Sequence, residues 1–314
     1  MPPSLVLQFV IEHKRGENRS LGPSAMSRGN TGWRARQFLA FCLVTAAFLL
    51  PACDLSETRV VPLGPPAGTG PQAGFAPFTF IQAGDPQIGG WTTIEDTKGR
   101  FVQLAHIANR LQPAVVVVVG DLVNDGPHEK ELAAFDDGLK EFRVPVRLIP
   151  GNHDDIATYR RKYGADHYSF TVNNCEFVCI NSSLLAGLRH SDQERKEADE
   201  QWKWLEETLA AAREHGRTHV FLVMHHPPEM LTSAARLDSI FRRYGVGVIL
   251  AGHIHRTSQI TLRGYTTFTV AGTGWAGDGK GFGYRLFHVF ADRVEQEYIR
   301  LDSPVAASQP AAAE

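Results

Sequence analysis

An α/β sandwich, with two β-sheets between outer helices, is the fold class that the sequence predicts. Short apolar runs alternate with longer stretches whose apolar residues recur at helical spacing, as expected for stacked βαβ units. The run 114–119 is apolar throughout, which indicates a strand buried on both faces. From residue 258 onward only strand-like runs follow, which indicates a second sheet. Together these patterns predict a four-layer α/β/β/α sandwich of two mixed sheets flanked by helices, formed as one domain by residues 77–302.

Each element of this sandwich follows from a local pattern. The stretch 98–111 places apolar residues every three or four positions and stops before Pro113, as a helix does. Two short runs around Asn173 and Asn174 have the form of a hairpin. The predicted helices are 98–111, 129–142, 192–214 and 237–244. The predicted strands are 78–83, 114–119, 144–149, 168–172, 175–180, 218–224, 246–251, 258–262, 266–270, 284–290 and 294–299.

The bulk composition excludes some functions. The 314 residues are 43% hydrophobic and 21% charged, with a net charge of −2, so no broad basic surface for nucleic acid is expected. No Cys-x-x-Cys pair is present, which argues against a zinc finger. Cys175 and Cys179 lie four residues apart in a predicted strand, so they share one face. We interpret them as buried small apolar residues in preference to a disulfide.

Residues 1–53 have the pattern of an export signal. An uncharged apolar stretch at 38–50 follows several arginines and is too short to span a membrane. It ends in Leu-Pro-Ala-Cys, which resembles a bacterial lipobox with Cys53 as the lipidated residue. This predicts an exported lipoprotein, anchored to a membrane and facing the periplasm or the cell exterior. An uncleaved anchor, a plain signal peptide and a cytosolic protein are the alternatives, and Met26 is a candidate for the true start.

Two further segments carry no predicted domain. Residues 54–76 are rich in proline and glycine, which favours a flexible tether between the anchor and the domain. The Ala- and Ser-rich tail at 303–314 has the composition of a disordered segment.

Five polar clusters each follow a predicted strand. They are 84–87 (Gly-Asp-Pro-Gln), 120–124 (Gly-Asp-Leu-Val-Asn), 151–154 (Gly-Asn-His-Asp), 225–228 (His-His-Pro-Pro) and 252–255 (Gly-His-Ile-His). Ligands of α/β sheets bind beyond the carboxyl ends of strands, so these clusters can converge. A two-metal hydrolase needs this mixture of oxygen and imidazole ligands. Asp85, Asp121 and Asn152 taken alone also fit helix caps, but together with His253 and His255 they favour a metal site.

In this order the clusters resemble the metallophosphoesterase signature of the calcineurin-like superfamily, D-x-H, G-D-x-x, G-N-H-[DE], H-x-P and G-H-x-H. The resemblance implies a phosphate-ester hydrolase with two divalent metal ions, in which a metal-bound hydroxide attacks phosphorus. It assigns Asp85 and His255 to the first metal and Asp121 to both metals. It assigns Asn152, His225 and His253 to the second metal.

The same resemblance implies two catalytic residues. His153 would lie beside the substrate phosphate as an acid or charge stabiliser, and Asp154 would orient it. Asn124, three residues after Asp121, is either a residue that orients the ligands or a turn residue. His226 is either a residue that lines the pocket or binds backbone, or a further metal ligand.

Gln87 departs from the pattern, because the family usually has histidine at this position. Asp-Pro-Gln resembles a subgroup of calcineurin-like phosphoesterase domain-containing proteins. A glutamine oxygen is a harder and weaker ligand than imidazole, so Gln87 as a ligand of the first metal favours Mn²⁺, with Fe, Zn²⁺ or Mg²⁺ as alternatives. A Gln87 that does not bind metal is equally compatible with the sequence.

A glycine-rich segment at 272–283 lacks the spacing of a phosphate loop and precedes a strand. It either borders the substrate cleft, with Trp275, Lys280 or Arg285 touching substrate, or is a mobile connecting loop. A serine hydrolase is excluded because no Gly-x-Ser-x-Gly elbow is present.

The sequence thus predicts a metal-dependent phosphomonoesterase or phosphodiesterase whose partners are a phosphate-ester substrate and, through its lipid, a membrane. The alternative from another class is a non-catalytic surface lipoprotein that binds metal or a ligand through a degenerate first site. Gln87 is the only argument for this alternative.

Overall fold

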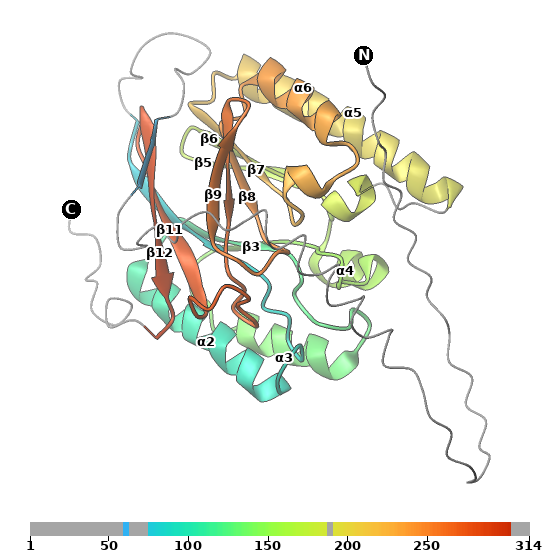
Figure 1. Cartoon of the computed structure of the whole chain (residues 1–314), viewed down its shortest axis with the longest axis vertical. Helices are drawn as coiled ribbons and strands as arrows, with labels where there is room; N and C mark the ends of the chain where they lie inside the picture. Colours follow the sequence, from blue (N-terminus) through green and yellow to red (C-terminus); the bar gives the residue numbers. More distant parts are fainter. Residues whose placement is uncertain (1–58, 63–74, 187–190, 303–314) are drawn as a thin grey trace, which may run out of the picture. The chain divides into compact units, whose positions relative to one another are not determined.

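Two six-stranded sheets form the centre of the structure. The structure is a computed structural model that describes residues 59–62, 75–186 and 191–302 (Figure 1). The first sheet has the strand order β1-β12-β11-β2-β3-β4 and the second has the order β5-β6-β7-β8-β10-β9. The first sheet contains β1 (Arg59–Pro62), β12 (Arg293–Arg300), β11 (Gly283–Val289), β2 (Phe78–Ala83), β3 (Val115–Val119) and β4 (Val146–Ile149). The second contains β5 (Tyr168–Val172), β6 (Cys175–Cys179), β7 (His219–Val223), β8 (Val248–Ala251), β10 (Tyr265–Thr269) and β9 (Ser258–Leu262).

Both sheets are mixed. Strands β2, β3 and β4 run parallel, while β11 pairs antiparallel with β2 and β12. In the second sheet β6, β7, β8 and β10 run parallel, and β5 and β9 close its edges antiparallel. The parallel strands of each sheet therefore end at a common edge, where their following loops can meet.

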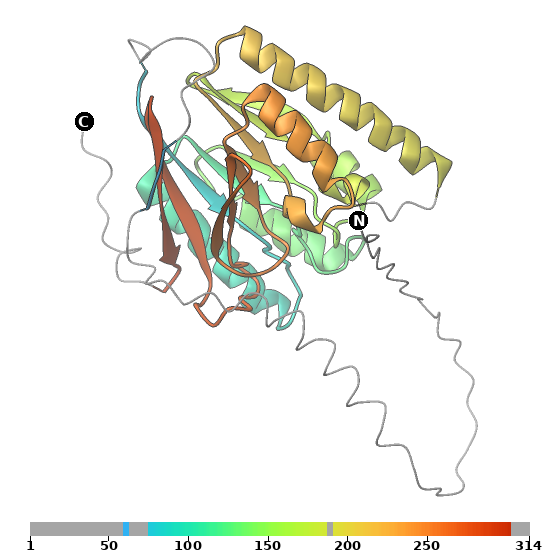
Figure 2. The same cartoon turned by 45° about the horizontal axis from the view of Figure 1, so that its top comes forward.

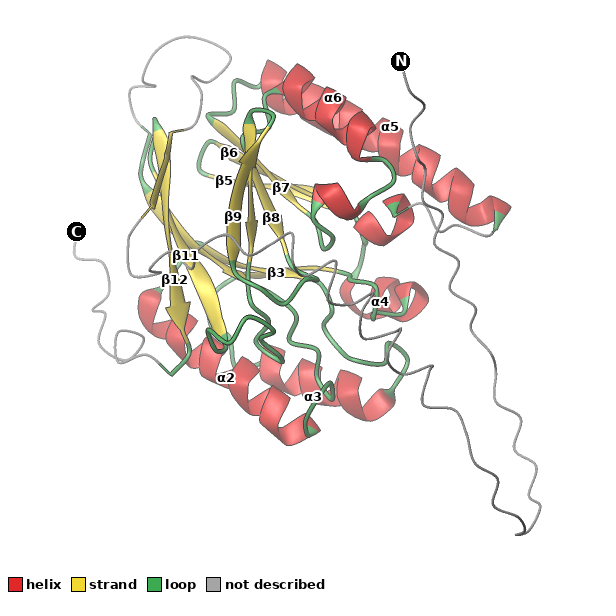
Figure 3. Ribbon diagram, in the orientation of Figure 1, coloured by secondary structure: helices red, strands yellow, loops and turns green. Residues whose placement is uncertain are grey.

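Helices cover the outer face of each sheet (Figure 3). Helices α2 (Ile94–Leu111) and α3 (Glu129–Leu139) pack on the first sheet, and α5 (Asp192–Glu214) and α6 (Ala234–Tyr244) pack on the second. Figure 2 shows the two helix pairs on opposite sides of the sheets. The predicted four-layer sandwich is confirmed.

Strand β3 shows why the sequence leads to this layering. Val115, Val117 and Val119 belong to the cluster between the two sheets, whereas Val116 and Val118 pack toward the helices. Because successive side chains of a strand point to opposite faces, a run of five valines can serve two apolar layers at once. Each buried valine contributes about 1.5–3 kcal/mol through removal of apolar surface from water.

The predicted helices differ from the structure at their ends. Helix α2 begins four residues earlier than predicted, because the Thr93 side chain accepts a hydrogen bond from the Asp96 amide and caps it. Helix α5 has the predicted bounds and starts with a capping box in which Ser191 and Glu194 bond each other's backbone. Helix α4 (Ile156–Tyr163) was not predicted, since its eight residues are too few to show a clear apolar period. Two 3-10 turns, η2 (Ser182–Leu185) and η3 (Pro228–Met230), complete the described elements.

The expected tether is partly structured. Residues 59–62, within the segment predicted to be flexible, form β1 and pair antiparallel with β12. This pairing covers the backbone groups of an edge strand that would otherwise remain unpaired. The export signal with Cys53 and the predicted tail at 303–314 lie outside the described residues. Within the described ranges, no helix combines the length and the apolar character that crossing a membrane requires.

Both cysteines of β6 are buried and free. Cys175 and Cys179 belong to the apolar cluster between the sheets, together with Phe177. The prediction of buried small apolar residues is confirmed.

Candidate metal centre

The five polar clusters converge at the edge where the parallel strands end. Backbone hydrogen bonds join their loops: the Asp85 amide donates to the Gly120 carbonyl (3.2 Å) and the Gln87 amide to the Asp121 carbonyl (2.8 Å). Across the two sheets, the His253 amide donates to Asp85 Oδ1 (3.0 Å). These bonds join the loops at 84–87, 120–124 and 252–255.

A first group of side chains unites Asp85, Asp121 and His255, with one potential ligand atom of each lying within 4.8 Å of the others. The Nε2 atom of His255 is 3.7 Å from Asp85 Oδ1. All three side chains are buried, Asp85 with no exposed surface and Asp121 with 1%. These are the residues predicted for the first metal and for the bridge.

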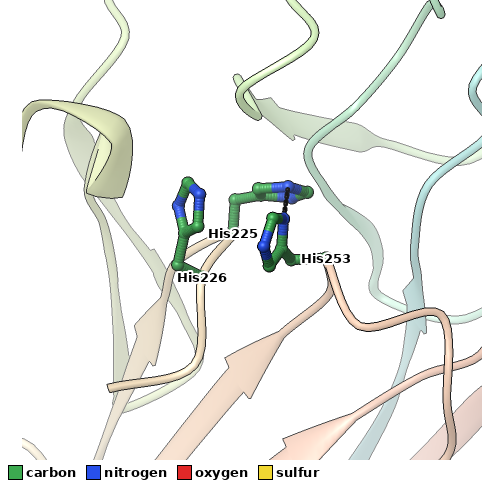
Figure 4. Close-up of side chains that lie close together, drawn as sticks. All are labelled: His225, His226 and His253. Carbon is green, nitrogen blue, oxygen red and sulfur yellow. Dashed lines mark hydrogen bonds between the residues drawn. The ribbon is translucent and has the colours of Figure 1, made fainter. Parts of the chain in front are cut away.

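A second group surrounds His225. Its Nε2 atom lies 3.0 Å from Asn152 Oδ1, 3.2 Å from His253 Nδ1 and 3.3 Å from Asp121 Oδ2. Figure 4 shows the rings of His225 and His253 side by side, with His226 beside them. Asp121 therefore belongs to the first group and touches the second, which is the geometry that a bridging carboxylate requires.

The tautomers of two histidines are set by backbone carbonyls. His225 Nδ1 lies 2.8 Å from the Val119 carbonyl, and His255 Nδ1 lies 3.2 Å from the Trp275 carbonyl. A carbonyl can only accept, so each Nδ1 carries the proton and donates. When the ring is neutral, the lone pair of each Nε2 then faces the carboxylates, as in histidines that bind metal ions.

The backbone is strained at the same residues. Nine described non-glycine residues have a positive φ, and five of them are Asp85, Gln87, Asp121, His253 and His255. The left-handed conformation costs about 1–2 kcal/mol per residue for a side chain with a Cβ. Such strain is characteristic of functional sites, where surrounding structure holds it in place.

Close packing at the site also requires glycine. Gly120 has a φ of +92°, and a Cβ there would come within 2.6 Å of His225 Nδ1. The glycine of the second cluster therefore allows the backbone to turn and the imidazole to approach.

Two of the buried oxygens that lack a hydrogen-bond partner within the described part of the chain lie at this centre, Asp85 Oδ2 and Gln87 Oε1. The amide group of Gln87 makes one long contact, from Nε2 to Asn124 Oδ1 (3.5 Å), and leaves its oxygen unsatisfied. A buried acceptor without a donor is costly. A divalent cation satisfies such oxygens, and the mixed oxygen and imidazole donor set suits one, so the residues present fit a metal centre.

The electrostatics of the site point the same way. Burial and the neighbouring Asp121 raise the pKa of Asp85 to about 8, although the charge of His225 opposes this. Burial works against ionisation of Asp121 as well, yet His225 holds its pKa well below the usual range. Burial disfavours the His225 cation, but Asp121 and Asp85 raise its pKa to about 9. Without metal and near neutral pH, a protonated imidazole thus lies beside the ionised Asp121, while Asp85 is mostly protonated.

His153 lies at the exposed border of this centre. Its Nδ1 donates to the Asn124 carbonyl (2.8 Å), and its amide donates to Asp121 Oδ1 (2.9 Å). This leaves Nε2 directed away from the backbone contact and available to a bound molecule.

The prediction that Asp154 orients His153 is wrong. The Asp154 carboxylate accepts hydrogen bonds from the amides of Gly151 (2.8 Å), Leu122 (3.0 Å) and Val123 (3.3 Å). It therefore fastens the loop after β4 to the loop after β3. Consecutive residues in a turn project apart, so the side chain next to His153 in the sequence does not contact its ring.

The carbonyl of Asn124 accepts the hydrogen bond from His153 Nδ1, and its side-chain oxygen lies 3.5 Å from Gln87 Nε2, so an orienting role of the Asn124 side chain toward the metal ligands stays a prediction. Its loop is fixed by Glu131 in the first turn of α3, whose Oε2 accepts from the amides of Asn124 (3.0 Å) and Asp125 (2.8 Å). Glu131 was missed by the sequence analysis, where it could only be recognised as an acidic residue at a helix N-terminus.

His226 offers a ring nitrogen within 4.8 Å of ligand atoms of His225 and His253, so these three histidines form a group that could hold a metal ion. The Ser182 hydroxyl accepts from the amides of His225 (3.2 Å) and His226 (2.9 Å) and lies 2.9 Å from His226 Nδ1. Because two backbone amides donate to the Ser182 oxygen, the hydroxyl proton of Ser182 is free to be donated to His226 Nδ1. The ring proton of His226 is then on Nε2, which makes this nitrogen a donor and favours pocket lining over metal binding.

Of the three residues proposed to touch substrate at the glycine-rich segment, Trp275 lies beside the centre. Trp275 packs against His255, with ring centroids 5.0 Å apart. Arg285 is 2% exposed and donates to the carbonyls of Thr269 (2.8 Å) and Ser258 (2.8 Å). The proposal that Arg285 touches substrate is therefore wrong, because its guanidinium is consumed within the fold.

The comparisons with known proteins agree with this geometry. The calcineurin-like phosphoesterase family matches residues 78–257, more than half of the chain. The chain is 27% identical over 268 residues to the serine/threonine-protein phosphatase CPPED1 of Bos taurus, covering 72% of this chain and 84% of that protein. It is 26% identical over 254 residues to a cAMP/cGMP dual specificity phosphodiesterase of Mycobacterium tuberculosis, covering 71% and 77%.

Among solved structures, a dimetal phosphatase from Danio rerio superposes with a TM-score of 0.60 at 16% identity, covering 71% of this chain and 97% of that one. The likeness shows the shared fold. The predicted superfamily, the α/β/β/α architecture and the metallophosphoesterase enzyme class are all confirmed. This chain belongs to the calcineurin-like phosphoesterase family.

Proposed function

We propose that this protein hydrolyses phosphate esters with two divalent metal ions held at the centre described above. The observation that carries the proposal is the shared position of Asp121, which belongs to one group of ligands and touches the other. When bound, paired metal ions supply charge stabilisation and an activated nucleophile for in-line displacement at phosphorus. Asp85, Gln87 and His255 hold the first ion, and Asn152, His225 and His253 hold the second.

Mn²⁺ is the metal we propose. The unsatisfied Oε1 of Gln87 is a neutral oxygen donor, which shifts the first site toward hard ions. The buried carboxylate of Asp85 adds a second oxygen there.

His153 acts on the substrate. Its ring is held by the Asn124 carbonyl through Nδ1, so Nε2 faces outward at the border of the centre. In its protonated form, Nε2–H donates to a phosphate oxygen and can pass a proton to the leaving oxygen.

Both classes of ester remain in the proposal. The relatives named above comprise a phosphatase and a cyclic nucleotide phosphodiesterase. Identities of 26% and 27% do not choose between these two activities, since peripheral loops set the substrate of a fold.

The test is hydrolysis of a chromogenic phosphomonoester and a matching phosphodiester by protein stripped of metal and then given Mn²⁺. Asp121→Ala and Gln87→His are measured beside the wild type. We expect activity that requires metal, falls to background in Asp121→Ala and persists in Gln87→His. The ratio of the two ester rates then assigns the enzyme as a monoesterase or a diesterase.

An inactive wild type would contradict the proposal. If Gln87→His were active while the wild type was not, the natural first site would be degenerate. The non-catalytic binding protein would then replace the enzyme as the better description.

We further propose that the protein is exported and anchored to a membrane through a lipid on Cys53. The support is the apolar stretch at 38–50 followed by Leu-Pro-Ala-Cys. In a bacterial host fed labelled palmitate, the wild type is expected to incorporate label and fractionate with membranes. Cys53→Ala should do neither, and equal labelling of both proteins would exclude this anchor.

A further inference from the structure

Trp91 is the most exposed large apolar side chain in the described part of the chain. Its exposed fraction is 69%, against 53% for Leu262 and 49% for Met230. An indole is among the side chains with the most to gain from burial. Exposure of this kind therefore marks a surface that another molecule can cover.

The indole of Trp91 is held in place by a second tryptophan. It stacks on Trp275 with ring centroids 4.7 Å apart and an angle of 22° between the planes. Because one face lies against Trp275, the exposed area of Trp91 belongs mainly to its other face and its edge. An aromatic face open to solvent is a binding surface for a second planar ring.

This pair leads directly out of the metal centre. The ring of Trp275 lies 5.0 Å from that of His255, and its carbonyl accepts from His255 Nδ1. His255, Trp275 and Trp91 therefore form a continuous row of rings from a metal ligand to the solvent. A single bound molecule can therefore place a phosphate at the centre and another group on Trp91 only if that molecule is extended.

The loop that carries Trp275 is built onto the first motif. The Gly274 amide donates to the Asp85 carbonyl (3.0 Å), and Arg100 donates to the carbonyls of Thr273 (3.0 Å) and Gly274 (2.9 Å). A Cβ on Gly277 would come within 2.8 Å of the Trp275 ring, so glycine there makes room for the indole. These contacts hold Trp275 in position at the site.

Trp91 is fixed by its own backbone. It has a φ of +62°, a conformation that is rare for a bulky residue and persists only where surrounding structure enforces it. It lies in the loop between β2 and α2, in which the Gly90 amide donates to the Gln87 carbonyl (2.8 Å). The strained backbone keeps the indole at the solvent side of the pair.

We propose that Trp91 and Trp275 form an aromatic shelf that binds the base of a nucleotide whose phosphate ester lies at the metal centre. The inference rests on the proposed phosphoesterase function and names its substrate class. Stacking of a base on an aromatic side chain contributes about 1–3 kcal/mol and tolerates any base, because every base has a π face. A phosphoserine side chain or a sugar phosphate has no aromatic ring to place there.

The test compares two esters that share the same ribose 5-phosphate group, adenosine 5′-monophosphate and ribose 5-phosphate. We expect Trp91→Ala to lower kcat/KM for the nucleotide about tenfold, chiefly through KM, and to leave ribose 5-phosphate unchanged. Trp91→Phe keeps a ring and should restore most of the preference. Leu262→Ala, which removes an exposed apolar side chain at the far end of β9, is the control and should alter neither ester.

Binding is measured separately from turnover, as quenching of tryptophan fluorescence by adenosine 5′-monophosphate in the metal-free protein. We expect quenching that ribose 5-phosphate does not cause and that weakens in Trp91→Ala. A wild type that turns over neither ester but shows this quenching would contradict the proposed monoesterase activity and keep the shelf. Equal losses for both esters, or quenching unchanged in Trp91→Ala, would overturn the shelf.

Discussion

Two buried aspartates of this molecule have opposite surroundings. Asp166 lies in a cluster with Arg160, His167 and Asn181, and its two oxygens accept hydrogen bonds of 2.9, 3.0 and 2.8 Å from these residues. Asp85, in the metal centre, accepts from one backbone amide, and its Oδ2 has no partner among the described residues. Both aspartates are almost inaccessible to solvent, with exposed fractions of 2% and 0%.

The pKa values follow from this difference. Burial tends to raise the pKa of Asp166, but hydrogen bonds from His167, Asn181 and Arg160 hold it well below its usual range. Burial and Asp121 raise the pKa of Asp85 to about 8. A buried carboxylate that the fold satisfies is a structural element, whereas one that the fold leaves unsatisfied calls for a cation from outside.

The sharpest test of this comparison is the same substitution at both sites. Asp166→Asn should lower the free energy of unfolding by about 1–3 kcal/mol, because the new NH₂ group cannot accept the hydrogen bonds that Arg160 and Asn181 donate. Asp85→Asn should stabilise the metal-free protein at pH 8, because it removes a poorly solvated carboxylate. Urea unfolding of both variants measures this.

Activity should respond in the opposite sense. Asp166→Asn is expected to keep the wild-type rate per folded molecule, and Asp85→Asn to lose metal and activity. If both variants lost stability equally in the absence of metal, the two aspartates would have the same role and the comparison would fail.

A second, smaller effect concerns Asp154. Asp154→Ala releases the amides of Gly151, Leu122 and Val123 and loosens the loops that carry Asn152 and Asp121. We expect metal affinity to fall about 10–100-fold, as is usual when a partner of the ligands is removed. Equilibrium dialysis with Mn²⁺ measures it. Unchanged metal affinity would show that these three hydrogen bonds do not hold the metal-binding loops in place.

The smallest expected effect is a pH trend of the metal-free protein. The folded pKa of Asp85 lies near 8, above its ordinary 3.8, so folding is progressively disfavoured as pH rises between these values. The folded pKa of His225 lies near 9, above its ordinary 6.5, so its stabilising contribution is complete below pH 6.5 and is lost as pH rises to 9. Asp166 acts oppositely, since its lowered pKa stabilises the fold above pH 3.8 and this contribution is lost in acid.

The urea midpoint without metal should therefore decline from pH 6.5 to 9, and saturating Mn²⁺ should reverse the decline. Metal binding displaces the protons of Asp85 and His225, so affinity rises with pH across this range. Asp85→Asn provides the control and should show a shallower decline. A midpoint that rises with pH in the metal-free wild type would contradict the assignment.

Much of the fold and the centre could be predicted from local sequence. The five valines of β3 require an apolar layer on each face of the strand. The site residues each follow a strand, and the direction of that strand decides at which edge of the sheet they lie: Asp85, Asp121, Asn152, His225, His253 and His255. Parallel strands bring their carboxyl ends to one edge whatever the detailed packing, so residues far apart in sequence meet there. The position of each cluster after a strand predicted that these residues meet, while the resemblance to the family supplied the metal that each one would bind.

The tertiary structure decided which atoms touch. Sequence adjacency suggested that Asp154 orients His153. In the structure the Asp154 carboxylate instead binds three backbone amides, and the carbonyl of Asn124 holds the His153 ring. The stacking of Trp91 on Trp275 joins residues 184 positions apart, and nothing in either local pattern predicts it. Strand ends follow from hydrophobic periodicity, which is local, whereas the direction of a loop side chain depends on backbone dihedral angles that distant packing imposes.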